Sequence, residues 1–231
     1  MCGRFVSATP PTVLAHHLRA DGVRTEALDP SWNVAPTDQV YAVAVNRAGE
    51  RLLGSYKWGL VPFWAKDSGV GARMINARAD SLGKRFAAPF ERRRCLVPAD
   101  GFYEWEKKPD GTKQPWFIHR ADDAPMVFAG LWEVWWPPGV DRDTNPPELR
   151  TCTIVTTDAN DLLRPIHDRM PVVLSPADWD EWLDRDNKDT AALHHLLVPA
   201  DPRAFEMYEV STRVNSVKNN DGELIEPASP A

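Results

Sequence analysis

The chain has 231 residues, is 43% hydrophobic and 26% charged, and carries a net charge of −6; this is typical of a soluble globular protein with one large or two small domains. Three widely spaced cysteines exclude a disulfide framework, no apolar run could cross a bilayer, and no leader is evident, so we expect a cytoplasmic protein. The charge does not exclude a nucleic-acid partner, because residues 1–120 carry 18 Lys and Arg against 12 Asp and Glu, whereas residues 121–231 carry 9 against 21. Phosphate contact needs only a local basic face.

The first predicted elements are a helix and an irregular loop. Thr9, followed by two prolines, has the pattern of a helix N-cap, and Leu14 and Leu18 give the helix an apolar stripe. Residues 29–36 have prolines near both ends. We therefore expect a shaped loop there.

Two strands and an aromatic loop come next. Residues 39–45 and 51–58 predict an antiparallel pair around a turn. Residues 58–64, Trp-Gly-Leu-Val-Pro-Phe-Trp, are interrupted by glycine and proline and predict a second loop. Its aromatic side chains either belong to the core or lie exposed, where stacking on unpaired bases would contribute about 1–3 kcal/mol each.

The remaining chain predicts more strands than helices. Residues 74–80 predict the start of a short helix. Further strands are expected at residues 95–98, 101–105, 115–119, 125–132, 150–156 and 171–174, and two helices near residues 175–183 and 190–197. Residues 136–147 contain four prolines and predict an exposed loop, and residues 219–231 predict a loosely ordered tail.

This order of elements has no regular βαβ rhythm. It predicts an α+β fold with curled antiparallel β-sheets, and no segment is polar enough to be a linker, so we expect a single domain over residues 1–231. No CxxC pair or cluster of Cys and His occurs. No metal site is therefore expected.

Glu104 lies among Phe102, Tyr103 and Trp105 in a predicted strand. Alternation leaves two positions open for its carboxylate: the solvent face of the strand, or an apolar pocket that raises its pKa. The second position would suit a general acid.

Cys2 carries the most specific chemistry in the chain. Removal of Met1 would leave Cys2 with a free α-amine and a thiol, which together convert an aldehyde into a five-membered thiazolidine. The ordinary pKa values, about 8 for the amine and about 8.5 for the thiol, leave usable nucleophiles at neutral pH. The alternative is an ordinary small residue at a frayed terminus.

The motifs together resemble one known family. They are Cys2-Gly3-Arg4-Phe5, Trp32-Asn33-Val34-Ala35-Pro36, Trp58-Gly59-Leu60-Val61-Pro62, Asn76-Ala77-Arg78-Ala79-Asp80, Arg94 to Pro98 with Gly101 to Trp105, and Ile166-His167-Asp168-Arg169-Met170-Pro171. In this order they resemble the SOS-response-associated peptidase family, from residue 2 to about Pro227. Two departures are Asp80, where members often have Glu, and Phe63-Trp64 or Trp64-Ala65, where they often have two adjacent tryptophans.

The resemblance implies an α+β domain with a barrel-like β core and short flanking helices. It also implies a protein, expected to be monomeric and to need no cofactor, that binds single-stranded DNA and joins covalently to abasic sites. The active-site residues carried over by motif are Cys2, Asn76, Glu104 and His167. The DNA-binding positions carried over are Gly3, Arg4, Asn33, Pro36, Trp64, Arg78, Thr156 and Arg169, of which Arg4, Arg78 and Arg169 would hold phosphates. On DNA the protein would associate with the nucleoid.

Three functions fit these residues. In the first, favoured by the aminothiol, Cys2 traps the ring-opened abasic sugar as a thiazolidine and shields the lesion, with Glu104 as acid and base. In the second, a cysteine peptidase that also removes its own Met1, Cys2 is the nucleophile, His167 the base and Asn76 the orienting group. In the third, the aromatic residues and arginines read single strands or modified bases without a covalent bond.

Overall fold

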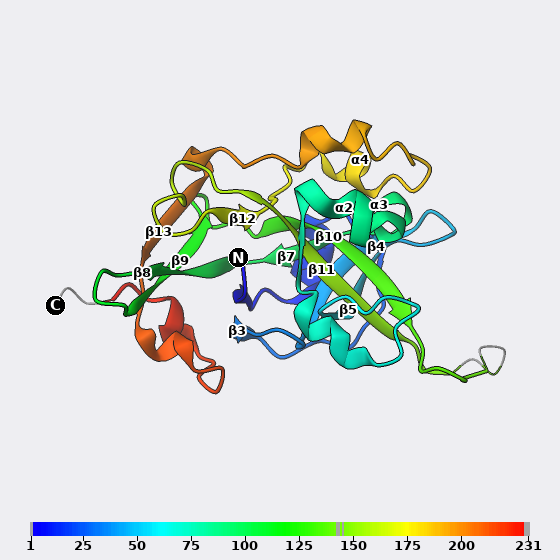
Figure 1. Cartoon of the computed structure of the whole chain (residues 1–231), viewed down its shortest axis with the longest axis horizontal. Coiled ribbons are helices and arrows are strands. Elements are labelled where there is room, and N and C mark those ends of the chain that lie inside the picture. Colours follow the sequence, from blue (N-terminus) through cyan, green and yellow to red (C-terminus); the bar gives the residue numbers. More distant parts are fainter. Residues whose placement is uncertain (1, 142–143, 145, 229–231) are drawn as a thin grey trace.

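A ring of five strands forms the centre of the computed structural model, which describes residues 2–141, 144 and 146–228 (Figure 1). The strands are β4 (Gln39–Val45), β5 (Arg51–Trp58), β7 (Arg94–Ala99), β10 (Met126–Trp135) and β11 (Leu149–Asp158). They pair in the order β11-β10-β7-β4-β5, and β11 then pairs with β5 in parallel to close the ring. Closure removes the two free edges that an open sheet would have.

Three short strands extend the ring. β6 (Asn76–Arg78) pairs in parallel with β11, β12 (Arg169–Pro171) pairs with β11 in antiparallel fashion, and β2 (Gly22–Val23) lies against β5. The register places Asn76 beside Ile154 and Arg78 beside Thr156. Residues of two distant motifs, one containing Asn76 and the other Arg169, therefore meet on β11.

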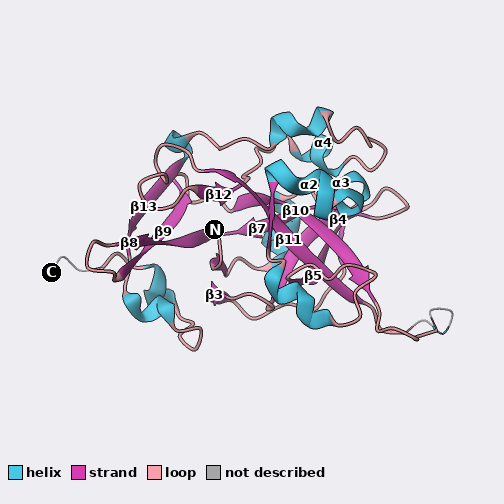
Figure 2. Ribbon diagram, in the orientation of Figure 1, coloured by secondary structure: helices cyan, strands magenta, loops and turns pink. Residues whose placement is uncertain are grey.

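A second, fully antiparallel sheet lies beside the ring (Figure 2). Its order is β13 (Phe205–Glu209), β9 (Lys113–Arg120), β8 (Gly101–Lys107), β1 (Phe5–Ser7) and β3 (Ser31–Val34). One apolar cluster joins the two sheets, since Cys2, Phe5 and Phe102 pack in the same core as Trp58 and Phe128 of the ring. The N-terminus lies between the sheets (Figure 1).

Short helices cover the outside of the ring. They are α1 (Pro11–His17), α2 (Leu82–Arg85), α3 (Ala87–Arg92) and α4 (Trp179–Leu183), with 3₁₀ helices at Ser68–Arg73, Ala79–Ser81 and Ala192–Leu196. Three more 3₁₀ helices, Pro202–Ala204, Thr212–Asn215 and Gly222–Ile225, lie at the second sheet, where Val214 and Leu224 pack with Tyr103 and Phe117. A second core between helices and ring contains Leu14, Phe90, Trp179 and Trp182. No helix among the described residues is long and apolar enough to cross a membrane. The predicted α+β class with a barrel-like core and short flanking helices is confirmed.

Several local predictions were wrong. Thr9 does not cap α1: its hydroxyl and backbone N–H both bond Asp100, and Pro10 occupies the cap position. Within residues 29–36, Ser31–Val34 form β3, because β1 supplies a pairing edge that the prolines do not block. Asn76–Arg78 form a strand and not a helix start, since β11 offers a parallel partner.

The predicted loose tail is also corrected. Residues 219–228 fold back on the body: Leu224 is fully buried, Asn220 accepts a hydrogen bond from the Trp32 backbone at 2.7 Å, and Val210 bridges Pro227. Residues 229–231 lie outside the described part. Within the predicted loop at 136–147, every described residue is exposed or half-buried. Residues 142, 143 and 145 lie outside the described part.

Candidate active site

Cys2 lies inside the molecule and not at a frayed end. The Tyr103 N–H of β8 donates to the Arg4 carbonyl at 3.0 Å and extends the β1–β8 pairing toward the N-terminus. Cys2 is 0% exposed, and its thiol lies 3.9 Å from the Arg4 carbonyl, to which it donates. The clamped strand therefore fixes the position of the second residue.

Asn76 holds the backbone of Cys2. Its Nδ2 donates to the Cys2 carbonyl at 2.8 Å, and the pairing of β6 with β11 fixes where this amide can reach. Asn76 Oδ1 is buried and has no hydrogen-bond partner among the described residues. A buried acceptor without a donor costs about 1–3 kcal/mol. The oxygen is thus available to a donor brought by a ligand or by the terminal amine.

Glu104 completes this group from β8. Glu104 is only 3% exposed, so its carboxylate lies inside the protein and not on the solvent face of the strand. Burial first, and the charge of Glu104 second, raise the pKa of the Cys2 thiol well above its usual range. The thiol is therefore neutral at physiological pH, and Glu104 acts electrostatically on it.

Arg4 and Asn33 form an adjoining network. Arg4 donates to Asn33 Oδ1 at 2.7 Å and to the Val214 carbonyl at 3.0 Å. Asn33 Nδ2 donates to three carbonyls, those of Val214, Ser216 and Asn219, at 3.3, 3.0 and 2.8 Å. Burial lowers the pKa of Arg4, which is half-buried. The segment 214–219, absent from the predicted site, thus supports two predicted DNA-binding residues; no sequence motif marks it.

His167, Arg169 and Thr156 form a third group on β11 and β12. The Arg169 N–H donates to His167 Nδ1 at 2.9 Å, which in the neutral ring leaves the proton on Nε2. Asp168 Oδ1 also lies 2.9 Å from Nδ1. The Arg169 side chain is buried and donates to the Thr156 carbonyl at 2.7 Å and to Asp158 at 3.0 Å. It clamps β12 to β11, and its phosphate contact stays a prediction.

The other predicted DNA-binding positions lie on the surface or close to it. Arg78 and Asp80 form an ion pair of 2.6 Å with 56% of each side chain exposed. Trp64 is 69% and Phe63 55% exposed, so the aromatic loop takes the exposed alternative while Trp58 is core. Gly3 and Pro36 are half-buried.

The aromatic loop is held by a backbone contact that requires glycine. Gly59 has φ of +129°, and a Cβ there would lie 2.6 Å from the Gly71 carbonyl. This close approach anchors the start of the loop on the 3₁₀ helix Ser68–Arg73.

No group of three or more His, Cys, Asp or Glu in the described part of the chain could hold a metal ion. The structure brings Cys2, Asn76 and Glu104 together, Arg4 with Asn33, and His167 with Arg169 and Thr156. What this arrangement offers is a buried neutral thiol, a carboxylate, a free acceptor oxygen and nearby cations. These groups suit carbonyl addition and anion contact.

Comparison with known proteins finds relatives in bacteria and in a vertebrate. It is 42% identical to the abasic site processing protein YoqW of Bacillus subtilis over 98% of this chain and 99% of the relative. The abasic site processing protein YedK of Escherichia coli is 33% identical over 98% of this chain and its own full length. The abasic site processing protein HMCES of Gallus gallus is 36% identical over 78% of this chain and 59% of its own.

A solved structure shares the fold. A crystal structure of a protein from Bacteroides thetaiotaomicron superposes with a TM-score of 0.83, at 25% identity, over 99% of this chain and all of the other. The family described as SOS response associated peptidase (SRAP) matches residues 1–217. The chain therefore belongs to the SRAP family.

Proposed function

We propose that this protein processes abasic sites in single-stranded DNA by forming a covalent bond through Cys2 after Met1 has been removed. The observation that carries the proposal is the burial of Cys2 against Asn76 and Glu104, which fixes a terminal aminothiol in one position. The names of the relatives, all abasic site processing proteins, support the same lesion as the substrate.

The chemistry balances without a cofactor or a redox step. The Cys2 amine adds to the C1′ aldehyde of the ring-opened deoxyribose, so an N–C1′ bond forms and the oxygen becomes a hydroxyl. Protonation of that hydroxyl expels one water and leaves an iminium ion. The thiol sulfur then bonds C1′ and its proton is released, which closes the thiazolidine. A neutral thiol beside a carboxylate suits this last step, because the carboxylate can take the proton.

The neighbouring side chains have distinct roles in this proposal. Glu104 moves protons at the hydroxyl and at the sulfur, and in reverse it assists release of the DNA. Asn76 holds the Cys2 carbonyl and offers Oδ1 to the amine or to a sugar hydroxyl. His167 offers its Nε2–H as a hydrogen-bond donor, which would polarise the sugar ring oxygen or orient the sugar.

Single-strand binding would come from the exposed groups around this site. Trp64 and Phe63 offer faces for base stacking, and Arg78 offers an exposed cation for phosphate. The cysteine-peptidase alternative requires a thiolate nucleophile. The raised pKa of the Cys2 thiol opposes that requirement.

Denaturing gel electrophoresis tests the proposal. Wild-type protein incubated with a uracil-excised single strand should give a heat-resistant shifted band, and Cys2→Ser should lose it. A peptidase would instead cleave a peptide substrate and be blocked by iodoacetamide whether or not DNA is present. A non-covalent reader would shift the strand on a native gel and leave nothing on the denaturing one; either result would refute the proposal.

A further inference from the structure

Four cavities that share walls follow the outside of the ring, and we call them together the flank groove. The first, of about 540 Å³, lies at Met74 beside β6 and shares Trp64 with a second of about 230 Å³. The second shares Phe63 with a third of about 700 Å³, and the third shares Arg47 and Arg185 with a fourth of about 600 Å³. The cavities therefore adjoin one another from Met74, two residues before Asn76, to the fourth cavity.

The fourth cavity lies at the end of the ring remote from Cys2. It is lined by the β4–β5 turn, including Val45 and Arg51, whereas the active site adjoins the other end of β5, where Trp58 pairs with Cys152. The eight residues of β5 span roughly 23 Å between these ends. This distance corresponds to about seven steps along a DNA strand at 3.4 Å each. A DNA strand bound at Cys2 therefore needs about seven further nucleotides to reach the fourth cavity.

Unpaired cations line this groove along its length. Within the described part of the chain, seven of them have no carboxylate within 4.0 Å: Arg47, Lys66, Arg73, Lys84, Arg85, Arg185 and Lys188. The chain has more acidic than basic residues, so carboxylates are available to pair with cations. These seven cations nevertheless have no such partner among the described residues, and the fold gives no reason for it. They form a ready contact surface for an external polyanion.

Three carboxylates of the groove have partners. Glu133 pairs with Arg93 at 2.7 Å, and Asp180 pairs with Arg51. Asp184 accepts the Asp186 N–H at 2.9 Å, which holds its carboxylate on the backbone. Asp67 and Asp186 also line the groove, but its walls carry ten Lys and Arg against five Asp and Glu, so the local field is positive.

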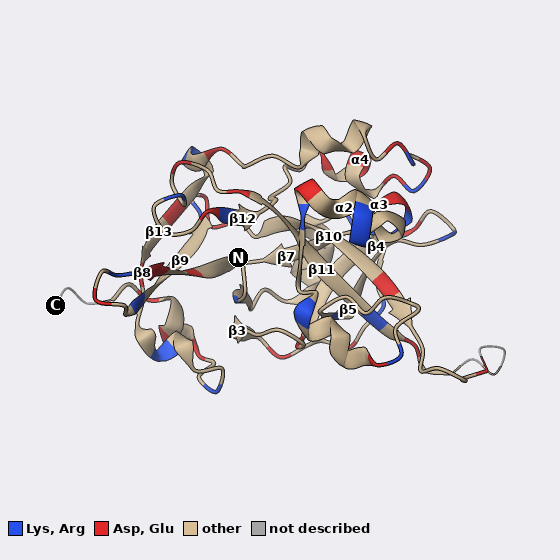
Figure 3. Cartoon of the chain, in the orientation of Figure 1, with Lys and Arg blue, Asp and Glu red and all other residues tan. Residues whose placement is uncertain are grey.

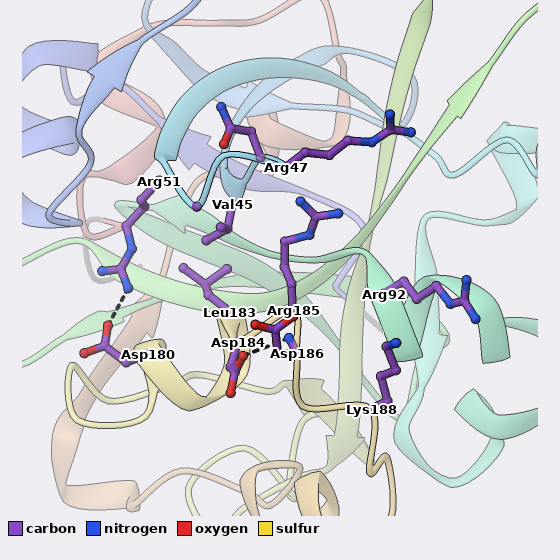
Figure 4. Close-up of a pocket in the computed structure, with 12 residues that line it drawn as sticks. Val45, Arg47, Arg51, Arg92, Asp180, Leu183, Asp184, Arg185, Asp186 and Lys188 are labelled. Carbon is purple, nitrogen blue, oxygen red and sulfur yellow. Dashed lines mark hydrogen bonds and ion pairs between the residues drawn. The ribbon is translucent and has the colours of Figure 1, made fainter.

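In the fourth cavity, cations from three segments converge. Figure 4 shows Arg47 from the β4–β5 turn, Arg92 from the end of α3, and Arg185 and Lys188 from the loop after α4 around one hollow. The turn and this loop lie side by side at the far end of the ring, away from the N-terminus (Figure 3). Trp132 and Trp136 line the adjoining third cavity and supply aromatic surface beside the charges.

We infer that the far end of the flank groove, at Arg47, Arg92, Arg185 and Lys188, is a second DNA-binding surface. It holds the phosphodiester backbone of the DNA that flanks the lesion, without reading its sequence. This inference rests on the proposed function. It adds a length requirement: DNA that reaches the far end is held more tightly than DNA that fills only the Cys2 site.

The test compares the triple variant Arg47→Gln, Arg185→Gln, Lys188→Gln with a matched control. The control, Lys107→Gln, Lys113→Gln, Arg203→Gln, removes three exposed cations from other elements. Fluorescence anisotropy would measure binding of undamaged single strands of about 4 nucleotides, too short to reach the far end, and of about 40 nucleotides across a salt series. A third DNA would carry a duplex arm beside the single strand. Crosslinking of an abasic site in the short strand would be measured in parallel.

Loss of three phosphate contacts on a single strand should flatten the slope of log affinity against log salt by about 2. We expect this change for the triple variant with the long strand or with the duplex arm, and no change with the short strand or in the control. The DNA that shows the larger change identifies whether single-stranded or duplex backbone occupies the surface. Equal slopes for the triple variant, the control and the wild type on both long DNAs would overturn the inference. Absence of any wild-type crosslink would instead refute the proposed function.

Discussion

The contact between Asn76 and the Cys2 carbonyl allows a prediction that separates catalysis from stability. Asn76→Ala removes the 2.8 Å hydrogen bond and leaves the carbonyl of a fully buried residue unpaired. A buried hydrogen-bonding group left without a partner costs about 1–3 kcal/mol. Every 1.4 kcal/mol of activation free energy changes a rate about tenfold. We therefore expect crosslinking to an abasic strand to slow by about 5- to 150-fold, since residue 2 is no longer held in place.

Stability should change less than the rate. The same substitution removes Asn76 Oδ1, the buried acceptor without a partner, and this gain offsets part of the loss. We expect the free energy of unfolding to fall by about 1 kcal/mol or less, as measured by urea denaturation.

Asn160→Ala is the matched control. Asn160 is also buried, at 5% exposure, and its side chain donates to the Ala200 carbonyl at 3.0 Å and accepts the Leu163 N–H at 3.1 Å. This variant should lose more stability than Asn76→Ala and keep the wild-type crosslinking rate. If Asn76→Ala crosslinks within about twofold of wild type, or if both variants slow in proportion to their lost stability, Asn76 does not position Cys2 for the reaction.

Three further predictions follow from burial and charge. Glu104→Gln should slow both formation and reversal of the crosslink in single-turnover assays, and unchanged rates would remove Glu104 from the mechanism. Trp64→Ala should weaken single-strand binding by about 1–3 kcal/mol in anisotropy titrations and leave the melting temperature unchanged, because Trp64 is 69% exposed. Burial raises the pKa of the Cys152 thiol above its usual range, so the unfolded chain loses this proton first and stability falls as the pH rises above about 8.5. Cys152→Ala should make that decline shallower by about 1.4 kcal/mol per pH unit, and an unchanged slope in alkaline urea denaturation would contradict it.

The sequence predicts the hairpin β4–β5 with correct bounds because its signal is local. Alternating residues and the turn at 46–50 define the pair before any distant strand is considered. The glycine and proline around Trp64 predict the loop itself, whereas only the structure shows that Trp64 is exposed. Local patterns thus account for the ring strands and for the aromatic loop.

Other features depend on partners far away in the chain. Asn76–Arg78 become a strand only because β11 lies alongside, and the sequence Asn-Ala-Arg-Ala contains nothing specific to strands. Residues 219–228 have little apolar content, yet Asn33 and Trp32 bind their backbone and side chains. Neither contact is visible in a local pattern.

The position of Glu104 could not be predicted for a related reason. Alternation reports burial only where one face of a strand meets solvent. The first four residues of β8, Gly101 to Glu104, are all buried, so both faces are covered and the pattern is uninformative. The motif resemblance names Glu104, whereas only the structure sets its charge against the Cys2 thiol.

The central claim, that a liberated Cys2 amine and thiol both bond the abasic sugar, is tested most directly by mass spectrometry of the crosslinked N-terminal peptide. The account predicts a peptide that begins at Cys2 and carries the sugar with a mass equal to the two parts minus one water, with both nitrogen and sulfur blocked to alkylation. A crosslinked peptide that still carries Met1, or one whose thiol is free to alkylate, would contradict it.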